Sequence, residues 1–392
     1  MQTSIFAFAT DLADEGIETV LDNVQNRGGL GGITIAAAYH EGRDVFPHNP
    51  VRKVRFLESG ALFFPPDESR WRGVRLRPPV SEAAGAFPAA VAAAADRGLV
   101  VNAWTVFLHN GALAESAPDC APENAFGDRY PVDLCPANPD VREYAEALAA
   151  DVAGQGVAAI LSESLHHHPL EHGVAHERYF VPLGERARFL LGLCFCPHCL
   201  AAAERSGVDG EAVRSAARDE LEGVFAGAAG EPLGTLEPGL AGYVRARAET
   251  VTTLAAAVTA AAHASGARFD FIDLSGAVKG YATGRPEGEP AAAIAWRLGV
   301  DLPALADVCD GLEAIGYAAD PARVRLDLEA YGTFGGDLSV VMRPMPPDSD
   351  SASNLGEKVR IARELGLRRV DFYHYGLMRL DALDLIREAL ES

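Results

Sequence analysis

A (β/α)8 barrel is the fold class that the sequence predicts, on two observations. Short runs rich in Val, Ile, Phe and Tyr alternate with helix-like segments, and the order begins with a strand and ends with a helix. Several runs are almost continuously hydrophobic, which is typical of strands buried on both faces of a parallel sheet. The eight predicted strands are residues 4–9, 33–39, 99–107, 157–163, 267–273, 312–317, 338–343 and 369–375.

Helix-like segments follow these runs, at 16–27, 82–97 and 381–390 among others. After the third strand, Asn138 followed by Pro139 supplies an N-cap and a proline in the first turn. The glycine-rich stretch at 28–32 precedes the second strand and is typical of a helix stop and turn. Because no phosphate-binding fingerprint follows the first strand, we prefer the barrel to a doubly wound sheet.

A capping signal also marks the helix before the last strand. Asn354 with Glu357 resembles a capping box that opens a helix over 359–365, and Gly366 ends that helix. Asp320 before a proline is typical of another helix N-cap, and we expect Cys309 to be a buried apolar residue.

The connections indicate where an active site would form. Segments that follow the second to fifth strands are long, whereas those that enter the strands are mostly short turns, and barrel active sites form at the C-terminal mouth. We expect one barrel domain over 1–392, with an insertion at about 164–266 that carries a cysteine cluster. An insertion without a core of its own is our preferred interpretation, and a small subdomain is the alternative.

Composition restricts the class of protein. The 392 residues carry a net charge of −21, with 48% hydrophobic and 23% charged residues, which indicates a soluble protein with a large core. A nucleic-acid partner is not expected, because the chain has only three lysines and its arginines are scattered among acids. The alanine-rich stretch 253–265 is shorter than the ~20 residues of a membrane span. The first residues lack the pattern of a signal peptide, so we expect a cytoplasmic protein.

The cysteines predict a metal site. Cys194, Cys196 and Cys199 form a Cys-x-Cys-x-x-Cys knuckle, a spacing that favours Zn²⁺. Cys135 is the preferred fourth ligand, since the loops after neighbouring barrel strands lie side by side. The substitutes for it are Cys120, His198 and His172. A four-cysteine zinc site would be structural, while ordinary reduced cysteines and a redox role are the alternatives.

Two carboxylates end predicted strands at the expected mouth. Glu163 ends the fourth strand and Asp273 the fifth, so we expect them to be the catalytic pair. Other strand ends supply polar and aromatic side chains of the kind that binds sugars. The expected substrate-binding residues are His40, Asn102, Trp104, Tyr317, Arg343, Tyr373 and His374.

A run of histidines follows Glu163. His166, His167 and His168, with His172, His176 and Glu177 further along, offer metal ligands or acid–base groups. A solvated loop is the simpler interpretation, because three adjacent side chains of an extended segment cannot all face one site.

The chain also resembles a group of bacterial glycoside-hydrolase-like (β/α)8 proteins. The resemblance lies in the segment from Asp133 to Tyr144, which includes Cys135, in Glu163, in His176-Glu177, and in the segment from Ala187 to Cys199. It implies a sugar-related site at the mouth and supports pairing Cys135 with the knuckle. Many glycosidases of this fold carry catalytic glutamates at the ends of strands four and seven. Here the seventh predicted strand ends in Arg343 and Pro344, so it has no matching glutamate.

The sequence therefore favours a carbohydrate-active, glycosidase-like enzyme with a small-molecule sugar or glycoside as substrate. One alternative is a metal-dependent sugar isomerase, epimerase or lyase that uses Glu163, Asp273 and His168 or His176 as ligands. The other is a barrel that binds sugar without turnover.

Overall fold

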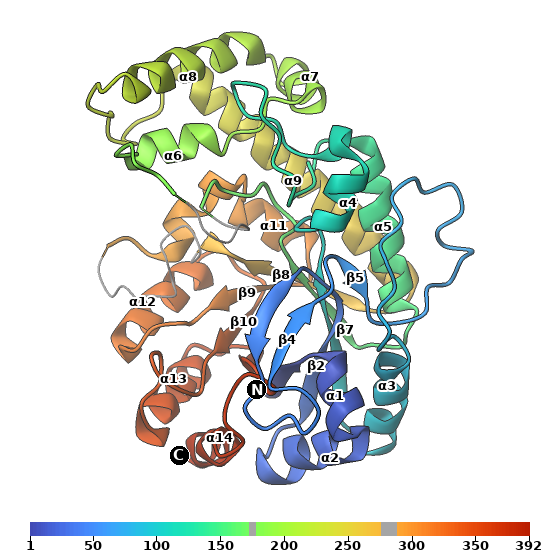
Figure 1. Cartoon of the computed structure of the whole chain (residues 1–392). Helices are drawn as coiled ribbons and strands as arrows, with labels where there is room; N and C mark the ends of the chain where they lie inside the picture. The colour runs from blue at the N-terminus through green and yellow to red at the C-terminus, as the bar shows by residue number, and fades with distance from the viewer. Residues whose placement is uncertain (172–177, 276–287) are drawn as a thin grey trace.

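The computed structural model describes residues 1–171, 178–275 and 288–392, and its centre is a closed barrel of eight parallel strands (Figure 1). Each strand pairs in parallel with its neighbours, and β1 pairs with both β11 and β2, which closes the sheet. The predicted (β/α)8 fold is confirmed. The barrel strands are β1 (Gln2–Ala7), β2 (Gly32–Tyr39), β6 (Val100–Val106), β7 (Ala159–Glu163), β8 (Arg268–Asp273), β9 (Gly311–Ile315), β10 (Asp337–Met342) and β11 (Arg369–Phe372).

Helices connect successive strands and pack around the barrel (Figure 1). The predicted caps at Asn138 and Asp320 are confirmed, because each side chain accepts a hydrogen bond from a backbone N–H of the first turn. The helices of the outer ring are α2 (Ile17–Asp22), α3 (Ala86–Asp96), α5 (Pro139–Ala153), α9 (Pro238–Ala264), α11 (Leu302–Val308), α12 (Pro321–Gly332), α13 (Ala352–Glu364) and α14 (Ala382–Glu391).

Some predicted boundaries were wrong. The first strand ends at Ala7, and a helix, α1 (Ala9–Glu15), follows it before α2. The N-cap of α13 is Ser351, whose Oγ accepts from the Asn354 N–H, so the helix begins about one turn before the predicted capping box. Gly366 ends that helix as expected, with a φ of 71° that favours glycine.

Elements outside the barrel pattern lie after β2 and β6. A hairpin of β3 (Gly42–Val45) and β4 (Val54–Leu57) follows β2, and the short β5 (Ala61–Leu62) pairs antiparallel with β2. The long loop after β6 holds the short helix α4 (Gly111–Ser116).

A buried ion-pair network fills the lower part of the barrel interior. The Arg369 guanidinium donates to Asp270 at 2.8 Å, to Glu313 at 3.2 Å and to Asp371, and its side chain is 2% exposed. Each of these residues comes from a different strand except for Asp371, which shares β11 with Arg369. This charged layer was not predicted from the sequence.

The insertion after β7 supplies most of a second hydrophobic cluster, to which Ala125 in the loop after β6 also belongs, so the insertion is not without buried apolar side chains as expected. Helices α6 (Glu185–Leu191), α7 (Pro197–Arg205) and α8 (Gly210–Phe225) pack with the first half of α9 above the barrel (Figure 1). Leu190, Phe195, Leu221 and Tyr243 are among the buried side chains of this cluster, which is separate from the barrel core.

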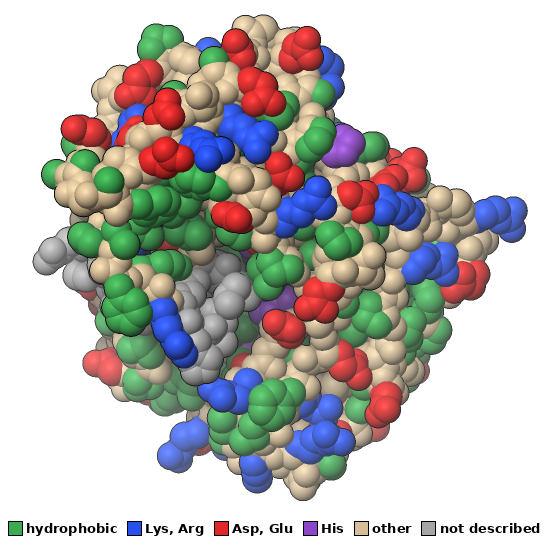
Figure 2. Space-filling model, turned by 45° about the horizontal axis from the view of Figure 1, so that its top comes forward, with side chains coloured by type: hydrophobic (Ala, Val, Ile, Leu, Met, Phe, Trp, Pro, Cys, Tyr) green, Lys and Arg blue, Asp and Glu red, His purple; other side chains and the backbone are tan. Residues whose placement is uncertain are grey.

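The surface shows mixed charge. Acidic and basic side chains are interspersed over the face shown in Figure 2, without a large basic patch on that face. Among the described residues, none of the helices combines the length and the apolar character that crossing a bilayer requires.

Candidate functional site

A small cavity of about 190 Å³ lies inside the barrel at its C-terminal end. Every barrel strand contributes a lining side chain, either from its last residues or from the position just beyond it. Most of the lining is aromatic or aliphatic. The described lining residues are Phe6, Tyr39, His40, Trp104, Glu163, Ile272, Leu274, Ile315, Tyr317, Val341, Arg343 and Tyr373.

Glu163 is the one carboxylate among the described residues that line this cavity. Its Oε2 accepts a hydrogen bond of 2.6 Å from Trp104 Nε1. Burial raises the pKa of Glu163 to about 7, although the Trp104 hydrogen bond and the nearby His109 both act to lower it. A carboxyl group that is half protonated near neutrality is suited to general acid catalysis.

Arg343 places a positive charge on the opposite side of the lining. Its guanidinium carbon lies 4.0 Å from the centre of the Tyr317 ring, and its Nη1 lies 3.3 Å from Asp348 Oδ2. Tyr373 packs against Trp104 with ring centres 5.7 Å apart. The structure therefore brings five of the seven predicted substrate-binding residues, His40, Trp104, Tyr317, Arg343 and Tyr373, to the same cavity as Glu163.

Asp273 does not reach the cavity, so the structure does not assemble the predicted pair. Side chains alternate along β8, and its neighbours Ile272 and Leu274 face the cavity. The Asp273 carboxylate is fully buried on the outer side, where it accepts hydrogen bonds from the Tyr331 hydroxyl on α12 and from Ser275 Oγ at 2.7 Å. These contacts attach β8 to α12, which is a structural role.

Asn102 and His374 also lie away from the cavity. Asn102 faces the barrel interior one layer below Trp104 and donates to Thr34 Oγ1 at 3.3 Å. The His374 ring is 1% exposed and packs 4.3 Å from the centre of the Phe8 ring. Burial lowers the pKa of His374 to about 3, so the ring is neutral and serves the packing behind the mouth.

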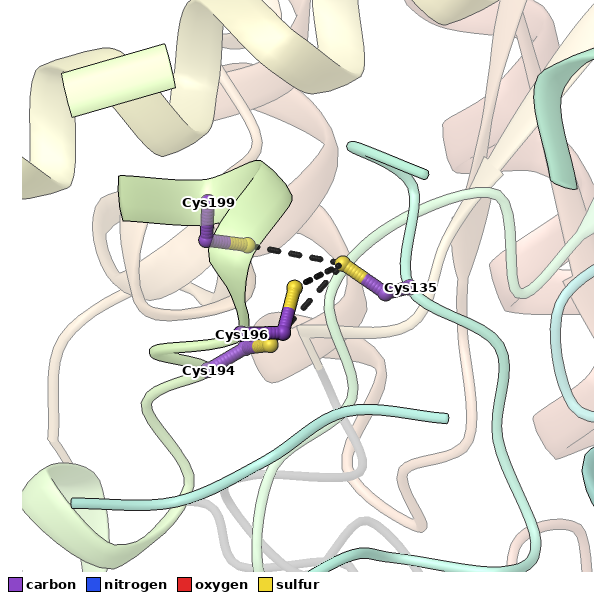
Figure 3. A group of neighbouring side chains, drawn as sticks. All are labelled: Cys135, Cys194, Cys196 and Cys199. Carbon is purple, nitrogen blue, oxygen red and sulfur yellow. Dashed lines mark hydrogen bonds between the residues drawn. The ribbon is translucent and has the colours of Figure 1, made fainter. Parts of the chain in front are cut away.

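The four predicted cysteine ligands meet at one point beside the barrel rim (Figure 3). Cys135 Sγ lies 3.4 Å from Cys199 Sγ, 3.5 Å from Cys196 Sγ and 3.8 Å from Cys194 Sγ. A tetrahedral ion with metal–sulfur bonds of about 2.3 Å requires sulfurs about 3.8 Å apart, and a disulfide requires about 2.05 Å. These sulfurs therefore fit a metal ion, and no pair of them is bonded as a disulfide.

Local structure fixes the knuckle. Helix α7 begins at Pro197, so Cys196 is its N-cap and Cys199 lies in its first turn. Two hydrogen bonds hold Cys194, the remaining cysteine of the knuckle. The Glu123 N–H donates to Cys194 Sγ at 3.4 Å, and the Tyr243 hydroxyl donates to the Cys194 carbonyl at 2.6 Å. Cys120 and His198, the substitutes considered for the fourth ligand, are not part of this group.

The histidine run is buried rather than solvated. His166, His167 and His168 are at most 8% exposed, which contradicts the simpler interpretation of the sequence. His168 and His109 both contact Asp133, a grouping across three segments that the sequence did not indicate. The remaining candidates of the run, His172, His176 and Glu177, lie outside the described residues.

Comparisons with known proteins show similarity of fold. No protein family matches the chain, and no curated protein matches it. The catalytic domain of a β-amylase from Paenibacillus polymyxa matches with a TM-score of 0.55 and 13% identity, over 97% of this chain and 94% of that one.

Two longer proteins match equally well. An α-L-fucosidase isoenzyme 2 from Paenibacillus thiaminolyticus has a TM-score of 0.55 and 13% identity, and a β-galactosidase from the psychrophilic Marinomonas ef1 has 0.56 and 12%. The matches cover 100% and 99% of this chain but 49% and 58% of those proteins, so the chain spans about half of their length. At these identities the likeness establishes the (β/α)8 barrel and no more.

Proposed function

We propose that the protein is a carbohydrate-active enzyme that cleaves a glycosidic linkage, with Glu163 as the general acid. The observation that carries this proposal is the state of Glu163, a carboxyl group with a pKa of about 7 in a cavity lined by aromatic rings. Such a group retains its proton near neutral pH and can deliver it to a leaving oxygen.

The cavity suits a sugar ring in size and in chemistry. Its volume of about 190 Å³ lies below the ~300–1,000 Å³ of ordinary ligand pockets, so we expect it to hold a single ring rather than a long chain. Trp104 and Tyr373 contribute aromatic lining to the cavity, while Arg343 and His40 contribute side chains that can donate hydrogen bonds. Glu163 accounts for the proton donor of the reaction, and no residue is assigned here as the nucleophile or general base.

The test is hydrolysis of a panel of aryl glycosides by the wild type and by Glu163→Gln. The variant keeps the size of the side chain but cannot donate an acidic proton, so we expect kcat to fall by about 10²–10⁴-fold. Calorimetry should show that sugar binding is retained. Glu185→Gln, an exposed glutamate in the insertion, is the matched control and should match the wild type. Wild-type turnover by Glu163→Gln would refute the assignment.

The second candidate is a barrel that binds sugar without turnover. It is favoured by the presence of a single carboxylate among the described lining residues, since most glycosidases use two. Calorimetric binding of a sugar by the wild type, with no product from any substrate of the panel, would decide for it. The metal-dependent alternative loses Asp273 as a ligand, because that side chain faces α12.

We also propose that the four-cysteine group binds Zn²⁺ in a structural role. Four thiolates complete a tetrahedral ion and leave no position for water. The ion would attach Cys135, in the loop after β6, to the knuckle in the insertion after β7. Cys199→Ser should lower both the zinc content and the melting temperature, whereas Cys309→Ser, a buried cysteine outside the group, should keep the zinc.

A further inference from the structure

A second group of convergent ligand atoms comes from the loops that also supply the four cysteines, the loop after β6 and the segment after β7. His109 Nδ1 lies 2.8 Å from Asp133 Oδ1, and His168 Nδ1 lies 2.6 Å from the same oxygen. One ligand atom from each of the three residues falls within 4.8 Å of the others. The exposed fractions are 4% for His109, 4% for Asp133 and 8% for His168, so bulk water is excluded from the group.

Backbone structure brings the three residues together. His109 and Asp133 face each other across an antiparallel bridge, and the Leu134 N–H donates to the Leu108 carbonyl at 2.8 Å. His168 arrives from the loop after β7. The rings of His109 and His168 lie nearly parallel, at 25° with centres 4.8 Å apart, and both Nδ1 atoms contact the same carboxylate oxygen. The arrangement does not depend on long, flexible side chains.

Charge favours a cation at this point. A buried carboxylate is costly unless positive charge or several hydrogen bonds compensate it. The ion pairs that the structure shows for Asp133 are those with the two imidazoles, which carry charge only when protonated. A divalent ion would supply that charge to neutral imidazoles. Two imidazoles and one carboxylate are the donor set that suits Zn²⁺ and Fe²⁺, with further positions left for water.

We propose that His109, Asp133 and His168 form a second metal site, which binds a divalent first-row transition metal ion. The site lies behind the wall of the mouth cavity, because the ring of the lining residue His40 is 4.6 Å from the ring of His109. It joins the loop after β6 to the loop after β7 on the side where Glu163 ends its strand. The proposal does not depend on the role of Glu163 or on hydrolysis.

Zinc content tests the proposal directly. The full chain is loaded with Zn²⁺, unbound ions are removed by gel filtration, and zinc per chain is measured by mass spectrometry. We expect about two ions in the wild type, one in each site, and about one in His168→Gln and in Asp133→Asn. His166→Gln is the matched control, since this ring lies 5.4 Å from that of His168 but is not one of the three ligands. It should retain about two ions.

Either of two results would overturn the proposal. The first is a zinc content of about one ion per chain in the wild type and of none in Cys199→Ser. The second is a zinc content in a folded His168→Gln protein that equals that of the wild type. If the variants do not fold, the wild type loaded with Co²⁺ gives the answer. Its absorption and X-ray absorption spectra should show nitrogen and oxygen ligands in addition to sulfur, and a spectrum of thiolate ligands alone would refute the second site.

Discussion

The hydrogen bond from Trp104 to Glu163 should lower the pKa of the Glu163 carboxyl group. Trp104 Nε1 donates to Glu163 Oε2 at 2.6 Å, which favours the ionised form. Trp104→Phe removes the donor and keeps an aromatic ring at the site. Hydrogen bonds to charged groups contribute about 1.5–3 kcal/mol, and each 1.36 kcal/mol corresponds to about one in pKa. The pKa of Glu163 should therefore rise from about 7 to about 8 or 9.

The assay is a ¹³C NMR titration of the glutamate side-chain carboxyl groups, which needs no substrate. Glu163→Gln identifies the resonance by its loss. If the enzyme is a glycosidase, the alkaline limb of the pH profile of kcat/KM should move in the same direction, because the acid form stays populated to higher pH.

Phe8→Leu is the control for loosened packing. Phe8 stacks on Trp104 with ring centres 5.6 Å apart but does not bond to Glu163, so its loss should leave the titration nearly unchanged. A pKa in Trp104→Phe that is equal to or below the wild-type value would refute the reasoning. It would mean that water entering the vacated space stabilises the carboxylate at least as well as the indole does.

Three further predictions concern stability. Arg369→Met removes the cation that Glu313 and Asp371 contact and leaves Asp270 with its longer contact of 3.4 Å to Arg268, so it should lower the free energy of unfolding by about 3–5 kcal/mol in a urea titration. Arg387→Met, at an exposed pair, should change it by at most about 1 kcal/mol. Tyr331→Phe removes a buried donor to Asp273 and should cost about 1–3 kcal/mol with kcat unchanged; a drop in kcat in the folded variant would return Asp273 to the catalytic candidates. Because the folded pKa of Glu163 exceeds the ordinary value of 4.5, its contribution to stability is present at acid pH and lost as pH rises through about 7. Melting temperatures measured at pH values below and above about 7 should not show this loss in Glu163→Gln.

The barrel was predictable from the sequence because its signal is repeated. Eight apolar runs in alternation with helices specify one topology even when each boundary is uncertain by a few residues. The cysteine site was predictable for a different reason. Cys194, Cys196 and Cys199 are held close by the chain itself, and only Cys135 had to be placed through the adjacency of two barrel loops.

The direction in which Asp273 points was not predictable. In a half-exposed strand the alternation of polar and apolar residues shows which face is buried, but both faces of a barrel strand are buried. Strand β8 carries Asp270 and Asp273 on opposite faces, the first bonded to Arg369 inside the barrel and the second to Tyr331 outside it. Both carboxylates need a buried partner, and the partners lie 99 and 58 residues away along the chain. The sequence around β8 therefore contains no local sign of the difference.

Two groups of side chains attach to each other the loops that follow β6 and β7, beside the strand end that carries Glu163. The loop after β6 supplies His109, Asp133 and Cys135, and the segment after β7 supplies His168 and the cysteine knuckle. Asp133 and Cys135 are separated by one residue, so a single short segment takes part in both groups. The apolar core of the insertion does not reach the cavity lining. Burial among side chains of the barrel strands raises the pKa of Glu163, and the two proposed metal ions would attach to each other the two loops that follow β6 and β7 beside this cavity.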